Sequence, residues 1–447
     1  METLFLCANM ARSKSPFAPI DPANVRMYVC GPTVHDLARL GNARSAVVFD
    51  QLRRVLSGLF PRVTFVRNVT DVDDKILARV LETGESVGDL TRRAHSAYPD
   101  DTAALGVAPP DIEPRATEHV GDMAAMVSRL LASGNAYLAE GHVLFEAATD
   151  PRRGALSGQD AAGLRAGARV EPAPWKRDPA DFVLRKPAAP GQVGWDGPWG
   201  FGRPGWHIEC SAMAGRHLGS VFDIHGGGHD LAFPHHENEI AQSTAAHGTD
   251  RMANWWMHNG MITVDGAKMS KGAGKFTTVR DLLGGGPRGG EALRPLLLPS
   301  HYRQALDFTQ ERLASAGAVL DRFHGILRDA PPAGGEPDPG VRVALLDDMN
   351  TPEAIAALHA LASRAAAAAG SARRTAADLR ASGALMGLLG TTPDAWFRRG
   401  GGTAEDAWVQ AAVDAREAAR GARRWAEADA IRAGLGPAGV SVEDGPP

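Results

Sequence analysis

Apolar and amphipathic segments alternate in the first quarter of the chain. Residues 26–30 predict a short buried strand that stops at a Gly-Pro-Thr break, residues 41–55 follow a helical pattern, and residues 63–70 predict a second strand. A strand, a helix and a strand within about 45 residues are typical of a βαβ unit. The pattern therefore predicts an α/β fold with a doubly wound, parallel, Rossmann-like sheet.

The middle of the chain predicts an insertion and then the second half of this sheet. Residues 113–148 have a helical pattern that becomes strand-like near 142–145. Residues 150–205 are rich in Pro, Gly and Trp with few periodic runs, which indicates an inserted segment. An apolar strand is expected again at 221–225, and Pro234 is suited to the first turn of a helix after it.

The last third predicts helices separated by breaks. Helical patterns cover the residues from about 291, the Ala-rich stretch 341–390, and one further helix at 404–434. The composition of 329–340 predicts a linker, and 398–403 predicts a second break. We therefore expect an α-helical appendage on an α/β body.

Composition and charge narrow the class of protein. The 447 residues suggest about three domains, and 44% hydrophobic with 22% charged residues is ordinary for a globular protein. The net charge of −4 gives no global positive field, so a nucleic-acid partner would need local basic patches. Three cysteines exclude a disulfide framework and fit a reducing compartment. With no long apolar run and no basic leader, the expected location is cytoplasmic, away from membranes.

Four separated residues have the chemistry of a zinc site: Cys30, Cys210, His235 and Glu239. His235 and Glu239 are four residues apart on a predicted helix and so share a face. Cys30 ends a predicted strand, and the carboxyl ends of parallel strands converge on one crevice. The residues alone leave the alternative open, because isolated cysteines are commonly buried small hydrophobes and a His/Glu pair is commonly a surface pair. Cys7 lies outside these motifs and is expected to be structural.

Two segments are candidates for phosphate binding. The junction from Gly31 to Arg44 joins the first strand to the first helix, where backbone N–H groups favour anions, Gly41 permits close approach, and Arg39 and Arg44 add charge. The segment 266–275 places Lys268, Lys271 and Lys275 among Gly and Ser, as in a cationic loop that closes on phosphates. Taken alone, the first segment is weak evidence for nucleotide binding, and a lysine-rich loop such as the second is usually a solvated surface loop. The presence of both segments in one chain favours a nucleotide site.

A set of motifs in a fixed order resembles one known family. The stretches are MYVCGPTVHD, GNAR, VRNVTDVDDKI, GRPGWHIECSAM, DIHGGGHDLAFPHHENEIAQS, WWMHNGMI, KMSK, HYRQALDFT and DDMNTPEA. They span almost the whole chain and resemble the class I aminoacyl-tRNA synthetases, most closely the cysteinyl-tRNA synthetases. The resemblance implies a class I catalytic domain over 1–305, with an insertion at about 115–200 and a stem-contact region at about 255–305. It also implies a helical tRNA-binding, anticodon-side region over 306–447 with the linker 329–340.

The resemblance assigns roles to individual residues. It implies one zinc ion per chain, held by Cys30, Cys210, His235 and Glu239, that binds the thiolate of the substrate L-cysteine. The residues implied to bind cysteine are Thr70, Trp206, His225 and Asp230. Those implied to bind ATP, which enters with Mg²⁺, are Gly31, Thr33, Gly41, Asn42 and Lys271. The implied catalytic residues are Arg39, Asn42, Lys268 and Lys271.

The reaction that the resemblance implies has two steps. The carboxylate of cysteine attacks the α-phosphorus of ATP to give cysteinyl-adenylate and pyrophosphate, and the 3′-terminal ribose of tRNA(Cys) then takes the cysteinyl group. Serine offers a neutral hydroxyl, a far poorer zinc ligand than a thiolate, so no editing step is needed. The expected protein is a monomer that binds tRNA(Cys), L-cysteine and ATP.

Four features depart from the family pattern. Arg39 replaces the first His of the His-Ile-Gly-His/Asn signature, and His35 stands where the family has Tyr. Gly272 to Lys275 replace Ser-Leu-Gly-Asn, and the chain ends at Pro447 without a Gly-Thr-Thr-Trp-Arg-like tail. These changes are typical of a diverged copy. They keep open two alternatives, a ligase that passes cysteine to a non-tRNA amine and an inactive paralogue that binds cysteine or tRNA.

A possible RNA contact lies near the C-terminus. Arg416, Arg420, Arg423 and Arg424 fall at positions i, i+4, i+7 and i+8 of one predicted helix, a stripe that can contact phosphates. The alternative is an ordinary solvated face, because Glu417, Glu427 and Asp429 lie nearby.

Overall fold

A computed structural model describes most of the chain. The described residues are 2–8, 10, 13–159, 173–189, 191–268, 278–283, 288–328, 334–367, 372–397 and 403–436. They fall into two compact units, Met1–Thr391 and Thr392–Pro447, which are described separately.

The centre of the first unit is a four-stranded sheet in the order β10-β9-β3-β4, and all three pairings are parallel. Its strands are β3 (Val25–Val29), β4 (Val63–Arg67), β9 (Phe222–Gly228) and β10 (Ala253–Asn259). Helix α1 (Leu40–Leu59) connects β3 to β4, so the predicted βαβ unit is confirmed. β4 ends at Arg67, before the end of the predicted strand 63–70, and the side chain of the next residue, Asn68, accepts a hydrogen bond from the Gly31 N–H.

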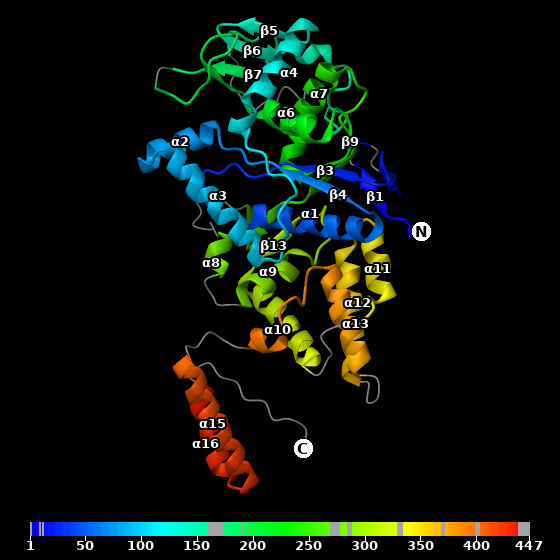
Figure 1. Ribbon diagram of the computed structural model, residues 1–447, viewed down its shortest axis with the longest axis vertical. Coiled ribbons are helices and arrows are strands. Elements are labelled where there is room, and N and C mark those ends of the chain that lie inside the picture. Colours follow the sequence, from blue (N-terminus) through cyan, green and yellow to red (C-terminus); the bar gives the residue numbers. More distant parts are fainter. Residues whose placement is uncertain are drawn as a thin grey trace. The chain divides into compact units, whose positions relative to one another are not determined.

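Both faces of this sheet are covered by helices (Figure 1). On one face Met27 and Val29 of β3 share a buried cluster with Val48 and Leu52 of α1. On the other face Tyr28 shares a second cluster with side chains of α6 (Trp206–Leu218) and α7 (Glu237–His247). The alternation of β3 side chains between two helical layers confirms the doubly wound arrangement.

The segment between β4 and β9 contains helices and an inserted sheet. Helices α2 (Asp74–Thr83) and α3 (Val87–Ala104) follow β4, and α4 (Val120–Ala132) follows a short turn, η1 (Ala116–His119). The inserted sheet is antiparallel in the order β5-β6-β7-β8. Its strands are Ala136–Ala139, His142–Phe145, Phe182–Pro187 and Gly202–Pro204. The insertion therefore carries a sheet of its own, which the Pro- and Gly-rich composition did not reveal.

After β10 the chain forms a small sheet and then helices. The strands β11 (Ile262–Val264), β12 (Ala267–Lys268) and β13 (Leu306–Phe308) pair in the order β12-β11-β13, and the N-terminal strands β1 (Phe5–Ala8) and β2 (Ser13–Pro16) form a hairpin. The helices of this part are α8 (Val279–Leu283), α9 (Arg288–Leu297), α10 (Gln310–Leu327), α11 (Pro339–Leu346), α12 (Thr351–Ala367) and α13 (Ala372–Leu385). Within the predicted linker the structure describes residues from 334, and α11 begins at Pro339.

The second unit corrects one prediction. It contains α14 (Pro393–Phe397), α15 (Thr403–Gly421) and α16 (Trp425–Leu435), so the single helix expected over 404–434 is two helices. The chain reverses at Arg423, whose φ of 59° lies in the left-handed region. The four arginines therefore do not form one stripe, since Arg416 is buried on α15 and Arg424, the N-cap of α16, pairs with Glu427 at 2.7 Å.

Among the described residues, none of the helices combines the length and apolar character that a membrane crossing requires.

Candidate functional site

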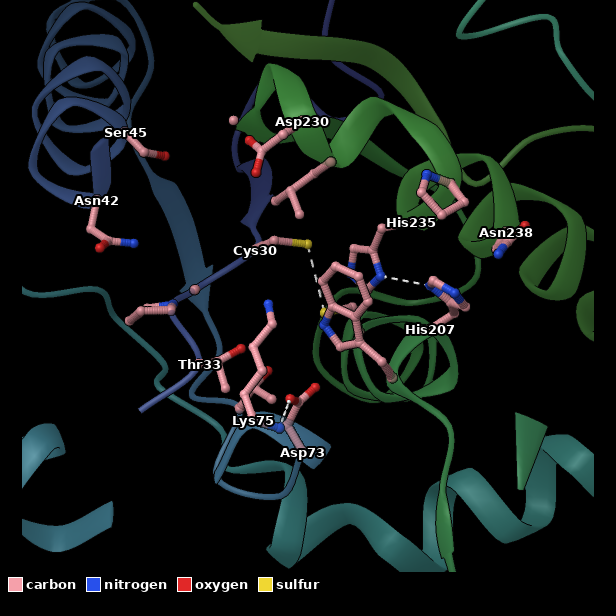
Figure 2. Close-up of a pocket in the computed structure, with 18 of the residues that line it drawn as sticks. Cys30, Thr33, Asn42, Ser45, Asp73, Lys75, His207, Asp230, His235 and Asn238 are labelled. Atoms are coloured by element: carbon pink, nitrogen blue, oxygen red, sulfur yellow. Dashed lines mark hydrogen bonds between the residues drawn. The ribbon is translucent and has the colours of Figure 1, made fainter. Parts of the chain in front are cut away.

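A cavity of about 870 Å³ opens where the parallel sheet meets the inserted sheet. Its walls come from the segment after β3, the start of α1, the start of α6, the turn before α7 and the strand β7. Figure 2 shows Cys30, His235 and His207 grouped on one side and Asn42 and Ser45 of α1 on another. The cavity thus brings together the two groups of candidate residues that the sequence placed far apart.

The four expected zinc ligands meet at the wall of this cavity. The ligand atoms of Cys30, Cys210, His235 and Glu239 all lie within 4.8 Å of one another. Cys30 Sγ is 3.6 Å from Cys210 Sγ and 3.5 Å from Glu239 Oε1, and His235 Nε2 is 3.0 Å from the same Oε1. With metal–ligand bonds of about 2.0–2.3 Å, the edges of a zinc tetrahedron are about 3.3–3.8 Å. The separations of 3.6, 3.5 and 3.0 Å lie within a few tenths of an ångström of these edges, so the donor set is compatible with a zinc ion.

The turn before α7 places His235 differently from the prediction. α7 begins at Glu237 rather than at Pro234, and His235 lies in a wide turn, Ala232–His236, in which Phe233 is not helical. His235 still reaches Glu239, since their side chains form a pair at 3.0 Å.

The buried charges at this site are strongly coupled. Burial would lower the pKa of His235, but the neighbouring Glu239 carboxylate and Cys210 raise it to about 10. Burial would raise the pKa of Glu239, but His225 and His235 hold it well below its usual range. A hydrogen bond from the Cys30 thiol lowers the pKa of Cys210 to about 6. A metal ion on these ligands would displace their protons, so its affinity depends on pH.

Further histidines surround the ligands and fix their orientation. His207 Nδ1 is 2.9 Å from His235 Nδ1, and His225 Nε2 is 2.8 Å from Glu239 Oε2. His236 Nε2 is 3.3 Å from Cys30 Sγ. Hydrogen bonds of this kind hold metal ligands in place and tune their basicity.

The structure contains a second group that could hold an ion, Cys30, His225, His236 and Glu239. In the first group Cys30, Cys210 and His235 line the cavity, whereas in the second only Cys30 does. The first group also supplies two thiols, which zinc prefers. Both differences favour the first group as the metal site that a ligand in the cavity reaches.

Three of the four residues expected to bind cysteine line the cavity beside this cluster. Thr70, Trp206 and Asp230 all contribute to its wall, and the Trp206 ring stacks on His235 with centroids 4.2 Å apart. His225 does not line the cavity. It is fully buried and contacts Glu239, one layer behind the wall.

The residues expected to bind ATP lie around the start of α1. Thr33, Gly41 and Asn42 line the cavity, and a Cβ at Gly41 would meet no atom within 4 Å, so the backbone there is open to a ligand. Asn42 Oδ1 accepts a hydrogen bond from the Arg39 N–H at 3.0 Å, which caps the helix. Gly31 also lines the cavity, but it is packed so closely that a Cβ would lie 1.6 Å from the Asn68 carbonyl oxygen.

The two arginines of this segment differ in position. Arg39 is half-buried and lines the cavity, where burial lowers its pKa. Arg44 is fully buried, does not line the cavity, and has a pKa that burial lowers to about 10. The expectation that Arg44 adds charge for phosphates is therefore wrong. On a helix, a residue two positions after Asn42 is rotated by about 200° from it and points to the opposite side.

The lysine-rich loop lies largely outside the described residues. Lys271 and the replaced positions Gly272 to Lys275 fall in 269–277, and only the backbone of Lys268 is described, in β12. After the loop, Thr278 pairs with Arg39 and Val279 N–H donates to the Ala38 carbonyl at 2.8 Å. The end of this loop is thus joined to the start of α1.

Several residues of the site had no signal in the sequence pattern. Lys75 lines the cavity with its Nζ 5.6 Å from the centre of the Trp206 ring. Glu237 is buried and accepts hydrogen bonds from the N–H groups of Gly154, Leu156 and Ser157 at 3.1, 2.9 and 2.8 Å. It ties the insertion to α7 beside the candidate metal ligands.

Comparisons with known proteins agree with this architecture. A family model described as the tRNA synthetases class I (C) catalytic domain matches residues 16–318, and a DALR domain model matches residues 340–390. Among solved structures, a LeuRS–tRNA–LeuAMS complex from Agrobacterium radiobacter is similar with a TM-score of 0.59 at 11% identity, covering 85% of this chain and 84% of that chain. A methionyl-tRNA synthetase from Mycobacterium tuberculosis is similar with a TM-score of 0.54 at 13% identity, covering 81% and 90%. These two structures support the class I fold.

Curated relatives are similar over nearly the whole length. A cysteine–tRNA ligase from Acidiphilium cryptum is 57% identical over 437 residues, 97% of this chain and 96% of that protein. One from Rhodospirillum centenum is 55% identical over 448 residues, 99% of this chain and 98% of that protein. The chain therefore belongs to the cysteine–tRNA ligase family of class I tRNA synthetases.

Proposed function

We propose that this chain activates L-cysteine with ATP and transfers the cysteinyl group to tRNA(Cys). The observation that carries the proposal is the convergence of Cys30, Cys210, His235 and Glu239 at the wall of a cavity that also contains the start of α1. This arrangement supports a zinc-dependent thiol site next to an anion-binding helix start.

Zinc bound by these four residues would take the substrate thiol as a thiolate ligand and so select cysteine over serine. Trp206 stacks on His235 and closes one side of this pocket. Asp230 lines the cavity with its carboxylate and is suited to the ammonium group of the amino acid. Thr70 contributes a hydroxyl that already accepts a hydrogen bond from the Asn68 amide at 3.2 Å.

At the other end of the cavity, the start of α1 and the cations around it would bind ATP with Mg²⁺. The N–H groups at the helix start and the guanidinium of Arg39 would offset the charge that develops on the α-phosphate as the carboxylate attacks and pyrophosphate leaves. Lys268 and Lys271 are assigned to the same task by the motif that contains them. A ribose hydroxyl of the tRNA 3′ end then attacks the carbonyl carbon, and AMP leaves.

The partners follow from this reaction. The helical region after residue 306, which includes the DALR match, is assigned to tRNA, and the protein is proposed to act as a cytoplasmic monomer. The alternative acceptors and an inactive paralogue remain the competing hypotheses, because Arg39 replaces the signature His.

The test is cysteine-dependent exchange of pyrophosphate into ATP, followed by charging of tRNA(Cys). The proposal expects both activities, with exchange abolished by serine in place of cysteine. Exchange without tRNA charging would favour another acceptor, and the absence of exchange in the zinc-loaded protein would favour the inactive paralogue.

A further inference from the structure

Arg44 is a buried cation that neither the metal site nor the phosphate site uses. It lies in α1 two residues after Asn42, is 0% exposed, and does not line the cavity. Among the described residues, no carboxylate pairs with it within 4 Å. Burying a guanidinium without a carboxylate partner costs free energy, so the hydrogen bonds that it makes instead are candidates for a structural or functional role.

The Arg44 guanidinium joins two segments that lie far from α1 in the sequence. Nη1 donates to the carbonyl oxygens of Gly260 and Met261 at 3.1 and 2.9 Å. Nη2 donates to Ser300 Oγ at 3.2 Å and to the His301 carbonyl at 3.4 Å. A planar fork of this kind can bridge two backbone segments at once, which a lysine cannot do.

The first of these segments is a wall of the cavity. Asn259, Gly260, Met261 and Ile262 all line it between β10 and β11, the strand that leads toward the lysine-rich loop. The wall is also tightly packed from behind, since a Cβ at Gly260 would lie 2.1 Å from the Gln304 carbonyl oxygen.

Arg44 also orients a polar side chain in this wall. Asn259 Nδ2 donates to the Gly260 carbonyl at 3.2 Å, the same oxygen that Arg44 holds. Asn259 is 4% exposed, and its Oδ1 has no hydrogen-bond partner in the described part of the chain. This shared carbonyl connects the guanidinium to a side chain of the cavity wall whose acceptor oxygen is buried without a partner among the described residues.

We propose that Arg44 is a positioning residue for the nucleotide. Its guanidinium holds residues 260–261 against α1. This contact fixes the cavity wall formed by Asn259 to Ile262 relative to the helix start that receives the phosphates. This inference rests on the proposed function, because it assigns the α1 end of the cavity to ATP. It predicts that the geometry of ATP binding, and not cysteine or zinc binding, depends on Arg44.

A matched control lies elsewhere on the chain. Arg294 of α9 is also 0% exposed and holds the Met386 and Leu105 carbonyls and the Asp50 carboxylate, but none of these three partners lines the cavity, whereas Gly260 and Met261 do. Arg44→Lys and Arg294→Lys therefore make the same change at two buried arginines. Both should lower the thermal midpoint, so the difference between them isolates the effect on the nucleotide.

The experiment is cysteine-dependent pyrophosphate exchange in the full-length zinc-loaded protein, with kcat and KM measured for ATP and cysteine separately. Arg44→Lys is expected to lower kcat/KM for ATP about tenfold or more, with KM for cysteine and the zinc content unchanged. Arg294→Lys should leave kcat/KM for ATP within about twofold of the wild type. Equal ATP kinetics in the two variants, or an equal rise in the KM for cysteine in Arg44→Lys, would overturn the inference.

A milder variant covers the case in which Arg44→Lys does not fold. Ser300→Ala removes one acceptor of the guanidinium and is expected to lower kcat/KM for ATP about two- to fivefold. Unchanged ATP kinetics in this variant would also overturn the inference. The two failures are distinguishable, because loss of exchange in the wild-type protein refutes the proposed function, whereas an active wild type with equal ATP kinetics in the two lysine variants refutes only the role of Arg44.

Discussion

The contact between His225 and Glu239 allows a sharp test of how the metal site is supported. Both side chains are 0% exposed, and His225 Nε2 lies 2.8 Å from Glu239 Oε2, while the other oxygen, Oε1, faces Cys30 and His235. His225→Leu removes this donor and leaves one oxygen of a buried carboxylate without its partner. The ring stacks on Trp256 with centroids 4.5 Å apart, so an apolar replacement is compatible with the surroundings.

The expected magnitude follows from the type of hydrogen bond that is lost. A hydrogen bond to a charged group contributes about 1.5–3 kcal/mol, which corresponds to about 10- to 150-fold in an equilibrium constant. Zinc affinity should fall by that factor, in the range seen when other supports of metal ligands are removed. The measurement is competition for zinc with a chromophoric chelator at fixed pH.

His225→Gln is the control for this prediction, because its amide nitrogen can occupy nearly the place of the ring nitrogen and donate to Glu239. It should recover most of the zinc affinity. If His225→Leu binds zinc as tightly as the wild type, the support role is refuted. If both variants lose zinc equally, His225 is itself a ligand, and the second group of four residues is the metal site.

Three further predictions test other parts of the site. Glu237→Gln should lower the free energy of unfolding by about 2–3 kcal/mol, and with it the thermal midpoint, because it replaces a buried carboxylate that accepts three N–H bonds from 154–157. Glu82→Gln, at an exposed glutamate, is the control. An unchanged melting curve for Glu237→Gln would contradict this prediction. In the metal-free protein, ultraviolet absorbance should show a first thiolate that titrates with a pKa of about 6 and is absent from Cys210→Ser. Because the pKa of Cys210 is lowered to about 6, its thiolate is present above pH 6, and zinc affinity should fall as the pH drops below that value. A first thiolate that appears only near the ordinary pKa of a thiol would refute this prediction. Arg39→Ala should slow pyrophosphate exchange about 10- to 100-fold and Arg39→His should retain most of the rate; an Ala variant with the wild-type rate would remove Arg39 from the phosphate site.

Much of the α/β body could be predicted because its pattern is local. The strand at Val25–Val29, the helix at Leu40–Leu59 and the strand at Val63–Arg67 are consecutive, and each has the periodicity of its own structure. The strands of the insertion are short and lie among Pro and Gly, so their pairing depends on partners that no local pattern identifies. The break at Arg423 was missed because a left-handed arginine has no distinctive signal in an Ala- and Arg-rich stretch.

The convergence of the four candidate ligands could be predicted, but the residues that support them could not. Cys30 and His235 have the chemistry of zinc ligands, but the residue types alone also allowed a structural role, and only the family motifs around them favoured the metal. The role of Arg44 could not be foreseen, since a charged residue near a helix start suggests phosphate binding unless its direction around the helix is known. His207 and Glu237 act through contacts with residues 28 and about 80 positions away, which only the folded chain brings together.

The central claim is that Cys30, Cys210, His235 and Glu239 hold one metal ion that binds the substrate thiolate. The most direct measurement is the visible absorption of the cobalt-substituted protein during titration with cysteine and, separately, with serine. We predict thiolate-to-cobalt charge-transfer bands that intensify with cysteine, stay constant with serine, and are weakened in Cys30→Ser. A cobalt spectrum without thiolate bands, or with the same response to both amino acids, would contradict the account.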